Sequence, residues 1–166
     1  VRDGIGFNKT PSEYGAFPMD PYSHTPKHAG AQQPGMTGQV KEEVLSRFGE
    51  LGLRVSDGKV HFDPGLLRAV EFSSEPRPFR YLDVQGDWQE IRLPAGALAF
   101  TWCQVPVIYR LEEAASPATT LIFEHGMKEE LRGLSLSESM SSELFQRSGH
   151  IRQITVTLAP GNLLVD

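Results

Sequence analysis

The stretch that decides the fold is residues 51–65, which read LGLRVSDGKVHFDPG. Before it, apolar residues recur at three- and four-residue spacing, which is the period of an α-helix. Within it, apolar and polar residues alternate as on half-buried strands, on either side of the turn sequence Ser56-Asp57-Gly58. The change of period at Gly52 predicts that a helix ends here and that a β-rich region begins.

The helix before Gly52 is predicted over residues 37–51. Its apolar stripe consists of Val40, Val44, Phe48 and Leu51. A stripe of this kind usually faces a protein core. We therefore assign residues 37–53 to a linking helix.

After the helix, short strands are predicted to follow one another, separated by turn sequences rich in Gly, Pro and Asp. The predicted strands cover 54–55, 59–62, 67–72, 79–84, 88–93, 98–111, 119–124, 129–136, 151–158 and 163–165, with a short helix at 137–145. Frequent short strands are typical of a sandwich or barrel. We expect a mainly β fold, an antiparallel β-sandwich over residues 54–166, with an extended N-terminal arm and one or two helices.

The N-terminal arm, residues 1–36, has an unusual composition. It holds five Gly and five Pro, which makes regular helix unlikely. It also contains four aromatic residues, whereas a disordered linker is poor in them. We expect an irregular but ordered segment that lies on another protein surface.

The charge and cysteine content exclude several classes of function. Lys and Arg number 16 against 21 Asp and Glu, a net charge of −5, which argues against nucleic acid and against an anionic membrane surface as partners. No run approaches the ~20 apolar residues of a membrane span. Cys103 is the only cysteine, so an intrachain disulfide is excluded; we expect an inert thiol in a buried strand and a cytoplasmic protein.

The residues most suited to binding a ligand are carboxylates, amides, imidazoles and aromatic rings, which together recognise sugar hydroxyls and the apolar faces of sugar rings. Those in the arm are Asp20, Tyr22, His24, His28, Gln32 and Gln33. The alternative is that they only hydrogen-bond to the backbone of an irregular segment. The four-residue spacing of His24 and His28 suits a metal only on a helix, and Pro26 argues against one, so we predict no metal and no cofactor.

Trp88 is the one candidate outside the arm. It follows the polar turn Gln85-Gly86-Asp87 and would offer a stacking platform for a glycan if exposed. Glu42 and Glu43 are adjacent on the predicted helix and point in different directions, so they do not form a catalytic carboxylate pair. We therefore assign no catalytic residue.

One stretch of the chain resembles a known family. Residues 30–43, which read GAQQPGMTGQVKEE, and the helix-to-strand change at residues 51–66 resemble the end of the catalytic region of six-hairpin glycosidases. These (α/α)6-barrel enzymes include cellobiose and chitobiose phosphorylases. The resemblance covers residues 14–72, about a third of the chain. Residues 67–70 depart from it, because LRAV stands where the phosphorylases continue with Pro and Trp.

The resemblance implies that a last barrel helix passes into a small C-terminal β-sandwich and that the general acid lies upstream. We expect the C-terminal accessory domain of a larger carbohydrate-active enzyme, a glycoside hydrolase or phosphorylase-like protein, that is not catalytic alone. Its expected partners are the upstream barrel of the same chain, an oligosaccharide and a second copy bound through the arm. A carbohydrate-binding module and a structural or protein-interaction domain remain as alternatives.

Overall fold

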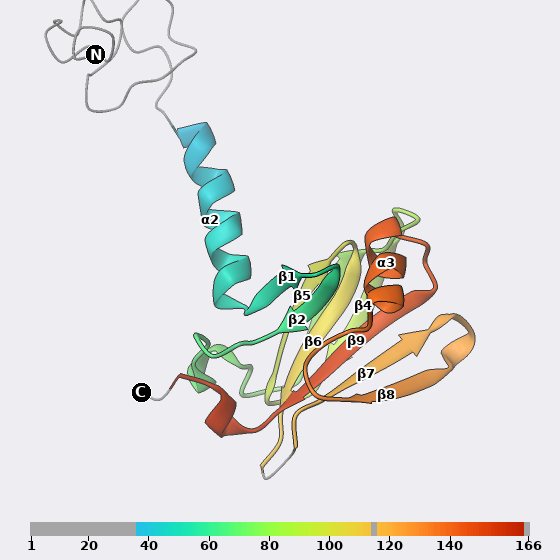
Figure 1. Cartoon of the computed structure of the whole chain (residues 1–166). Coiled ribbons are helices and arrows are strands. Elements are labelled where there is room, and N and C mark those ends of the chain that lie inside the picture. Colours follow the sequence, from blue (N-terminus) through green and yellow to red (C-terminus); the bar gives the residue numbers. More distant parts are fainter. Residues whose placement is uncertain (1–35, 114–115, 165–166) are drawn as a thin grey trace, which may run out of the picture. The chain divides into compact units, whose positions relative to one another are not determined.

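The predicted change from helix to strand is present at Gly52. In the computed structural model, which describes residues 36–113 and 116–164, helix α2 (Met36–Glu50) is followed by the hairpin of β1 (Leu53–Ser56) and β2 (Lys59–Phe62) (Figure 1). Gly52 has a φ of +71°, and a Cβ at this position would lie 1.9 Å from the carbonyl oxygen of Asp63. Only glycine fits at this position, so Gly52 determines where the chain turns from the helix into β1. The predicted arm lies outside the described residues, except for Met36.

Seven further strands follow in chain order. They are β3 (Arg77–Leu82), β4 (Trp88–Leu93), β5 (Ala97–Trp102), β6 (Val105–Leu111), β7 (Ala118–Phe123), β8 (Lys128–Arg132) and, after helix α3 (Glu138–Gln146), β9 (Ile151–Leu158). Single turns of 3-10 helix occur at η1 (Ala69–Glu71), η2 (Glu124–Gly126) and η3 (Pro160–Asn162). The predicted mainly β fold with antiparallel sheets and helices is confirmed.

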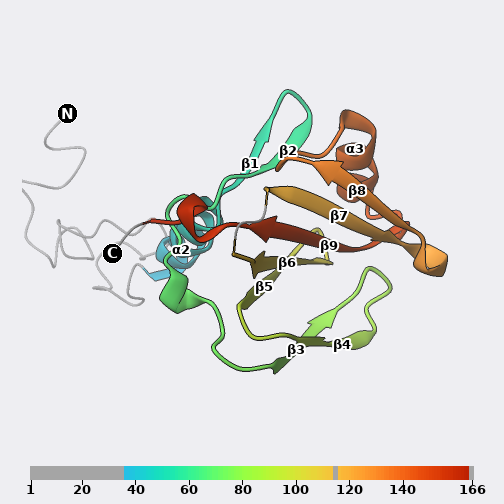
Figure 2. The ribbon, with the colours of Figure 1, turned by 90° about the horizontal axis from the view of Figure 1, so that it is seen from below.

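The strands form one five-stranded sheet and two hairpins. The order in the large sheet is β5-β6-β9-β7-β8, in which β6 and β9 pair in parallel and the other neighbours are antiparallel. The parallel pair arises because the chain completes the β7–β8 hairpin and α3 before β9 inserts between β6 and β7 (Figure 2). This crossover brings residues near 150 beside turns that are far away in sequence.

Both faces of the large sheet are covered over β6. Val107 and Tyr109 belong to a large buried cluster with the β1–β2 hairpin and α3, whereas Ile108 packs with the β3–β4 hairpin. Successive side chains of a strand point to opposite faces, so β6 carries residues of both clusters. The result is face-to-face packing of sheet on sheet, with the β3–β4 hairpin as a separate, smaller layer.

Three predicted strands differ from the structure. Residues 67–72 contain η1 rather than a strand, and Leu67 and Phe72 are buried on either side of it. The predicted strand 98–111 is two strands, because Cys103 and Gln104 have φ values of +51° and +65° and reverse the chain. Residues 163–164 form no strand. The apolar runs indicated the burial of Leu67, Phe72 and Leu163, but Val70 and Leu164 are exposed, and the runs did not show where extended structure is absent or interrupted.

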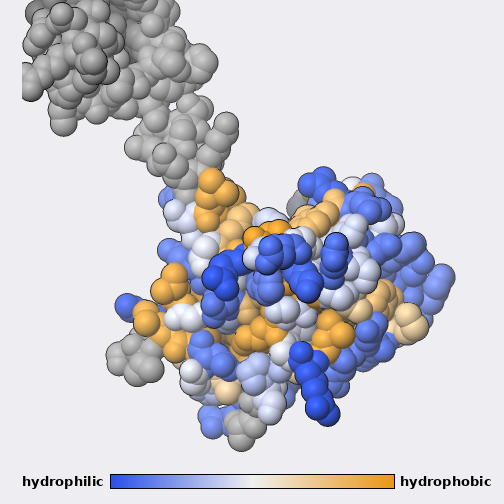
Figure 3. All heavy atoms as spheres, in the orientation of Figure 1, coloured by the Kyte–Doolittle hydropathy of each residue, from blue (hydrophilic) through white to orange (hydrophobic). Residues whose placement is uncertain are grey.

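The apolar stripe of α2 is only partly buried. Phe48 packs edge-on against Trp102, with ring centroids 5.0 Å apart, and Leu51 is buried. Val44, however, is 50% exposed, so the predicted core-facing stripe is not buried at this position. The neighbouring Leu45, which is not part of the stripe, is 71% exposed. The chain divides into two units at this point, residues 1–47 and 48–166. Elsewhere on the face seen in Figure 3, apolar side chains reach the surface in separate groups among polar ones.

Candidate ligand pocket beside the β3–β4 turn

Of the predicted site residues, Trp88 is the one that the structure describes. It is the first residue of β4 and is 73% exposed, paired across the hairpin with Leu82. The predicted arm residues lie outside the described part of the chain: Asp20, Tyr22, His24, His28, Gln32 and Gln33.

The β3–β4 hairpin has two different faces. Phe79 and Ile91, directly opposite each other, pack toward Ile108 of the large sheet. Because side chains alternate along a strand, Tyr81 follows Phe79 on this inner face, while Leu82 and Trp88 lie on the outer one. The rings of Phe79 and Tyr81 are stacked, with centroids 5.8 Å apart. Trp88 is therefore a platform on the outside of the hairpin.

The turn between β3 and β4 is organised by Asp83, which is only 9% exposed. Its Oδ1 accepts hydrogen bonds from the backbone N–H groups of Gln85 and Asp87, each 3.0 Å long, and its Oδ2 accepts one of 3.0 Å from the side-chain amide of Gln89. Burial raises the pKa of Asp83, but these hydrogen bonds outweigh it and bring the pKa below its ordinary value. Asp83 is thus an ionised structural group rather than a proton donor at neutral pH.

Next to this turn lies a pocket of about 570 Å³. Its lining comes from the hairpin and from the beginning of β9: Tyr81, Asp83, Val84, Gln85, Asp87, Gln89, Ile151 and Arg152. Arg152 Nη1 donates a hydrogen bond of 3.0 Å to Gln85 Oε1, which joins the two sides. Gly149 allows the close approach: a Cβ there would lie 3.3 Å from both Gln85 Nε2 and Val84 Cγ2.

Tyr81 contributes a phenol to the inner side of the pocket. Partial burial, followed by the negative charge of Asp83, raises the pKa of Tyr81 above its ordinary value of 10.0, and Arg152 opposes the shift. The phenol therefore stays protonated at neutral pH, as a hydrogen-bond donor and acceptor.

The neighbouring β5–β6 turn supports the pocket with a backbone conformation that is uncommon for its residues. Cys103 and Gln104 are both in the left-handed region, where glycine or asparagine is expected. The side-chain amide of Gln104 donates a hydrogen bond of 3.0 Å to the carbonyl of Asp83. Unfavourable backbone conformations of this kind concentrate at functional sites.

Cys103 lies in this turn and not in a strand, which corrects the prediction. Burial raises the pKa of its thiol, and a nearby Arg147 acts in the opposite direction through its charge and a hydrogen bond. A raised pKa leaves the sulfur as an unreactive thiol at neutral pH.

Within residues 36–113 and 116–164, no group of three His, Cys, Asp or Glu side chains is arranged to hold a metal ion. In the same part of the chain, no helix has the length and apolar character needed to cross a membrane. Comparisons with protein-family models and with curated proteins find no match. The geometry of the pocket is therefore the main guide to function.

The chemistry of the pocket is that of a hydrogen-bonding site. Asp87 has no side-chain hydrogen bond to another described residue, and Tyr81 likewise has none through its hydroxyl. Gln89 uses its amide nitrogen on Asp83 and keeps its oxygen for another donor. From the sequence, this region is predicted as two strands, 79–84 and 88–93, joined by a turn at residues 85–87, with Trp88 as its one candidate site residue. The signal was present in the polar residues at every second position from 81 to 89, but nothing in the sequence connects them with Arg152.

Proposed function

We propose that this chain is the C-terminal accessory β domain of a larger carbohydrate-active enzyme and that it binds a neutral oligosaccharide in the pocket beside the β3–β4 turn. The observation that carries this proposal is the lining of the pocket. A phenol, two carboxamides, two carboxylates and a guanidinium surround one cavity. Each sugar hydroxyl both donates and accepts hydrogen bonds, so a sugar-binding site needs hydrogen-bond donors and acceptors.

The charges in the pocket favour a neutral ligand over an anionic one. Arg152 is the one cationic side chain in the lining, whereas Asp83 and Asp87 are both carboxylates. Arg152 also has one hydrogen bond committed to Gln85. A phosphate or carboxylate ligand would meet net negative charge, which opposes binding.

The assignment to a larger enzyme comes from the resemblance of residues 14–72 to six-hairpin glycosidases. On that basis, the catalytic acid belongs to an upstream barrel, and the arm with His24 and Gln33 approaches the sugar-binding mouth. Asp83, whose two carboxylate oxygens are both occupied by hydrogen bonds, does not serve as a catalytic base. Hydrolysis and phosphorolysis both remain compatible with this role.

Isothermal titration of the chain with cellobiose, chitobiose and maltose tests the proposal. Tyr81→Phe removes one free hydroxyl and is expected to weaken binding by a few-fold, in line with about 0.5–1.5 kcal/mol for a hydrogen bond. Asp87→Asn retains the shape and lowers the charge, and should weaken binding to a similar or smaller extent.

Trp88→Ala is the matched control, because Trp88 lies on the outer face of the same hairpin. If Trp88→Ala abolishes binding while Tyr81→Phe has no effect, the outer platform is the sugar site and the pocket is not. If none of these sugars causes heat or chemical-shift changes at millimolar concentration, the proposal of a sugar site fails.

One observation favours a second candidate, a protein-contact role. Val44 and Leu45 present apolar side chains on α2 at 50% and 71% exposure. Single exposed apolar residues are common, but two on one helix suit contact with another protein. Replacement of both with Glu should shift a multi-angle light-scattering mass from dimer to monomer if they join two copies; an unchanged mass opposes this role.

A further inference from the structure

Two hairpins of the fold are closed by turns with the same signs of φ. Each turn consists of the two residues between the last paired positions of its strands. Asp57 and Gly58 close the β1–β2 hairpin with φ values of +51° and +72°, and Cys103 and Gln104 close the β5–β6 hairpin with φ values of +51° and +65°. Positive φ at both central residues is what a type I′ turn requires.

The two turns differ in how well their residues suit this conformation. Type I′ turns strongly prefer Asn-Gly or Asp-Gly, because Asn and Asp tolerate the left-handed region and glycine has no Cβ to clash. Asp57-Gly58 has this preferred sequence, whereas Cys103 and Gln104 both carry a Cβ and are unfavourable there. Closure of the hairpin therefore does not explain Gln104, since glycine would close the same turn with less strain.

The side chain of Gln104 makes a contact that glycine would lose. Its amide nitrogen donates a hydrogen bond of 3.0 Å to the carbonyl oxygen of Asp83. The same oxygen accepts a bond of 3.0 Å from the N–H of Gly86, and the carboxylate of Asp83 accepts bonds from the N–H groups of Gln85 and Asp87. The β5–β6 turn is thus bonded to the residue that organises the β3–β4 turn.

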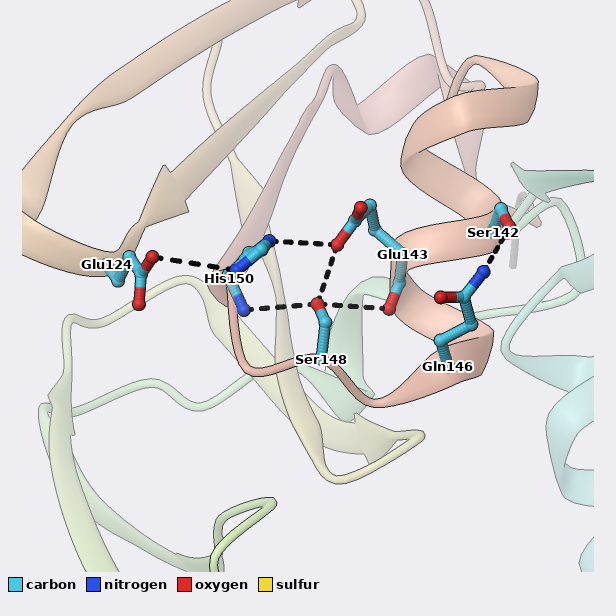
Figure 4. Close-up of polar contacts among 6 residues, drawn as sticks. All are labelled: Glu124, Ser142, Glu143, Gln146, Ser148 and His150. Carbon is cyan, nitrogen blue, oxygen red and sulfur yellow. Dashed lines mark hydrogen bonds and ion pairs between the residues drawn. The ribbon is translucent and has the colours of Figure 1, made fainter.

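The loop after α3 lies beside the same turn and supports it in a different way. Ser148 and His150 are both hydrogen-bonded to the carboxylate of Glu143, so their side chains hold this loop to α3 (Figure 4). Gly149 approaches the β3–β4 turn closely but has no side chain that could donate a hydrogen bond. The approach of Gly149 therefore supplies packing and not a side-chain anchor.

Among the described residues, two side chains outside the β3–β4 hairpin donate hydrogen bonds to its turn. Arg152 on β9 donates to the side chain of Gln85, and Gln104 donates to the backbone at Asp83. A side-chain acceptor can move by a change of rotamer, whereas a bond to the carbonyl restrains the main chain itself. Gln104 is therefore the side chain that restrains the backbone of the turn.

We propose that Gln104 is a positioning residue for the candidate pocket: its side chain anchors the β3–β4 turn through the carbonyl of Asp83, and this contact compensates for its unfavourable backbone conformation. Strained conformations of this kind persist where the surrounding structure holds them. The anchored turn presents Asp87 and Gln89 to the pocket. The anchor itself does not depend on a ligand, whereas its effect on sugar affinity rests on the proposed function.

Two substitutions separate the side chain of Gln104 from its backbone. Gln104→Met keeps a similar length and the left-handed strain but removes the donor. Gln104→Gly removes the donor and the strain together. Asp57→Gly is the matched control, because it relaxes the backbone of the equivalent turn in the β1–β2 hairpin and leaves Gln104 in place.

Amide hydrogen exchange of the full chain, measured by NMR, tests the anchor without a ligand. The amides of Gln85, Gly86 and Asp87 are expected to exchange about two- to tenfold faster in both Gln104 variants, the change expected when one hydrogen bond is lost. In Asp57→Gly these amides should exchange as in the wild type. Unchanged exchange in both Gln104 variants would overturn the anchor.

Thermal unfolding separates this local effect from global stability. Gln104→Met is expected to melt below the wild type, because it loses the hydrogen bond and keeps the strain. Gln104→Gly should melt about 2–4 °C above Gln104→Met, because the strain is relieved. Exchange at the β3–β4 turn should nevertheless be faster than wild type in both. If Gln104→Gly restores wild-type protection at the turn, the side chain is not the anchor.

Sugar affinity is the third readout and depends on the sugar site. If the wild type binds cellobiose, both Gln104 variants should bind it about two- to tenfold more weakly, and Asp57→Gly should bind it equally well. Faster exchange at the turn in a chain that binds no sugar would support the anchor and reject the proposed function. Unchanged affinity in variants whose turn exchanges faster would overturn the role of Gln104 in positioning the pocket.

Discussion

The two faces of the five-stranded sheet are stabilised in different ways. On one face, Val107, Tyr109, Ile154 and other fully buried residues pack with the β1–β2 hairpin and α3 in one large cluster. On the other, the β3–β4 hairpin is held over a cluster of three buried residues, Leu93, Ala97 and Ile108, and its turn is held by hydrogen bonds to Asp83. Apolar burial dominates the first face, and the second leaves polar groups available for a ligand.

The difference predicts that substitutions on the first face reduce global stability, whereas those at the β3–β4 turn mainly alter binding. Regions with few buried apolar contacts open locally at lower free energy than the core. A binding site for a polar ligand is expected in such a region, because the apolar side chains of a core cannot form hydrogen bonds with it.

The largest effect is expected for Gly52→Ala, next to the large cluster. The added Cβ would meet the carbonyl oxygen of Asp63 at 1.9 Å, in a backbone with φ of +71°. We expect a loss of about 3 kcal/mol or more in the free energy of unfolding, measured by chemical denaturation. Gly86→Ala in the β3–β4 turn, where φ is +86° and nothing lies within 4 Å, should cost only about 1–2 kcal/mol. Equal losses would show that the clash is relieved by a backbone shift.

A smaller effect is expected for Tyr109→Phe in the same cluster. The Tyr109 hydroxyl donates a bond of 2.6 Å to the carbonyl of Leu51, and both groups are buried. Its removal leaves the carbonyl unpaired and should cost about 1–2 kcal/mol of unfolding free energy. Tyr81→Phe in the pocket should leave the denaturation midpoint nearly unchanged. A larger loss at Tyr81 than at Tyr109 would contradict the contrast between the faces.

The smallest effect on stability is expected at Asp83, and it should disappear in acid. The pKa of Asp83 is lowered below 3.8 in the folded protein, so its contribution is present above that pH and is lost as the pH falls through the folded value. Asp83→Asn should therefore reduce the melting temperature slightly near neutral pH and converge with the wild type in strong acid. A difference that grows on acidification would contradict the assigned hydrogen bonds.

Much of the fold could be predicted because it depends on local signals. The turn at Asp57-Gly58, the strand 88–93 and the alternating strand 151–158 were each predicted within one or two residues. The errors occurred where an apolar run contains buried residues but does not form one continuous strand. Leu67 and Phe72 anchor a 3-10 turn, and the run through Cys103 contains a reversal without Gly or Pro to indicate it.

The site was predicted less well than the fold. The exposure of Trp88 was anticipated from the polar turn before it, but the pocket was not, since it needs Arg152 and Gly149 beside residues 81–89. The predicted arm residues, from Asp20 to Gln33, lie outside the described part of the chain and stay a prediction.

The sequence alone determined the class of fold and the position of the helix-to-strand change at Gly52, because hydrophobic periodicity and glycine act locally. The presence of a single cysteine likewise excludes a disulfide within the chain. Only the tertiary structure decided that β9 inserts in parallel between β6 and β7 and so brings Gly149 and Arg152 to the β3–β4 turn. The physical reason is that strand pairing depends on burial and hydrogen bonding between residues far apart in the chain, which no local pattern encodes.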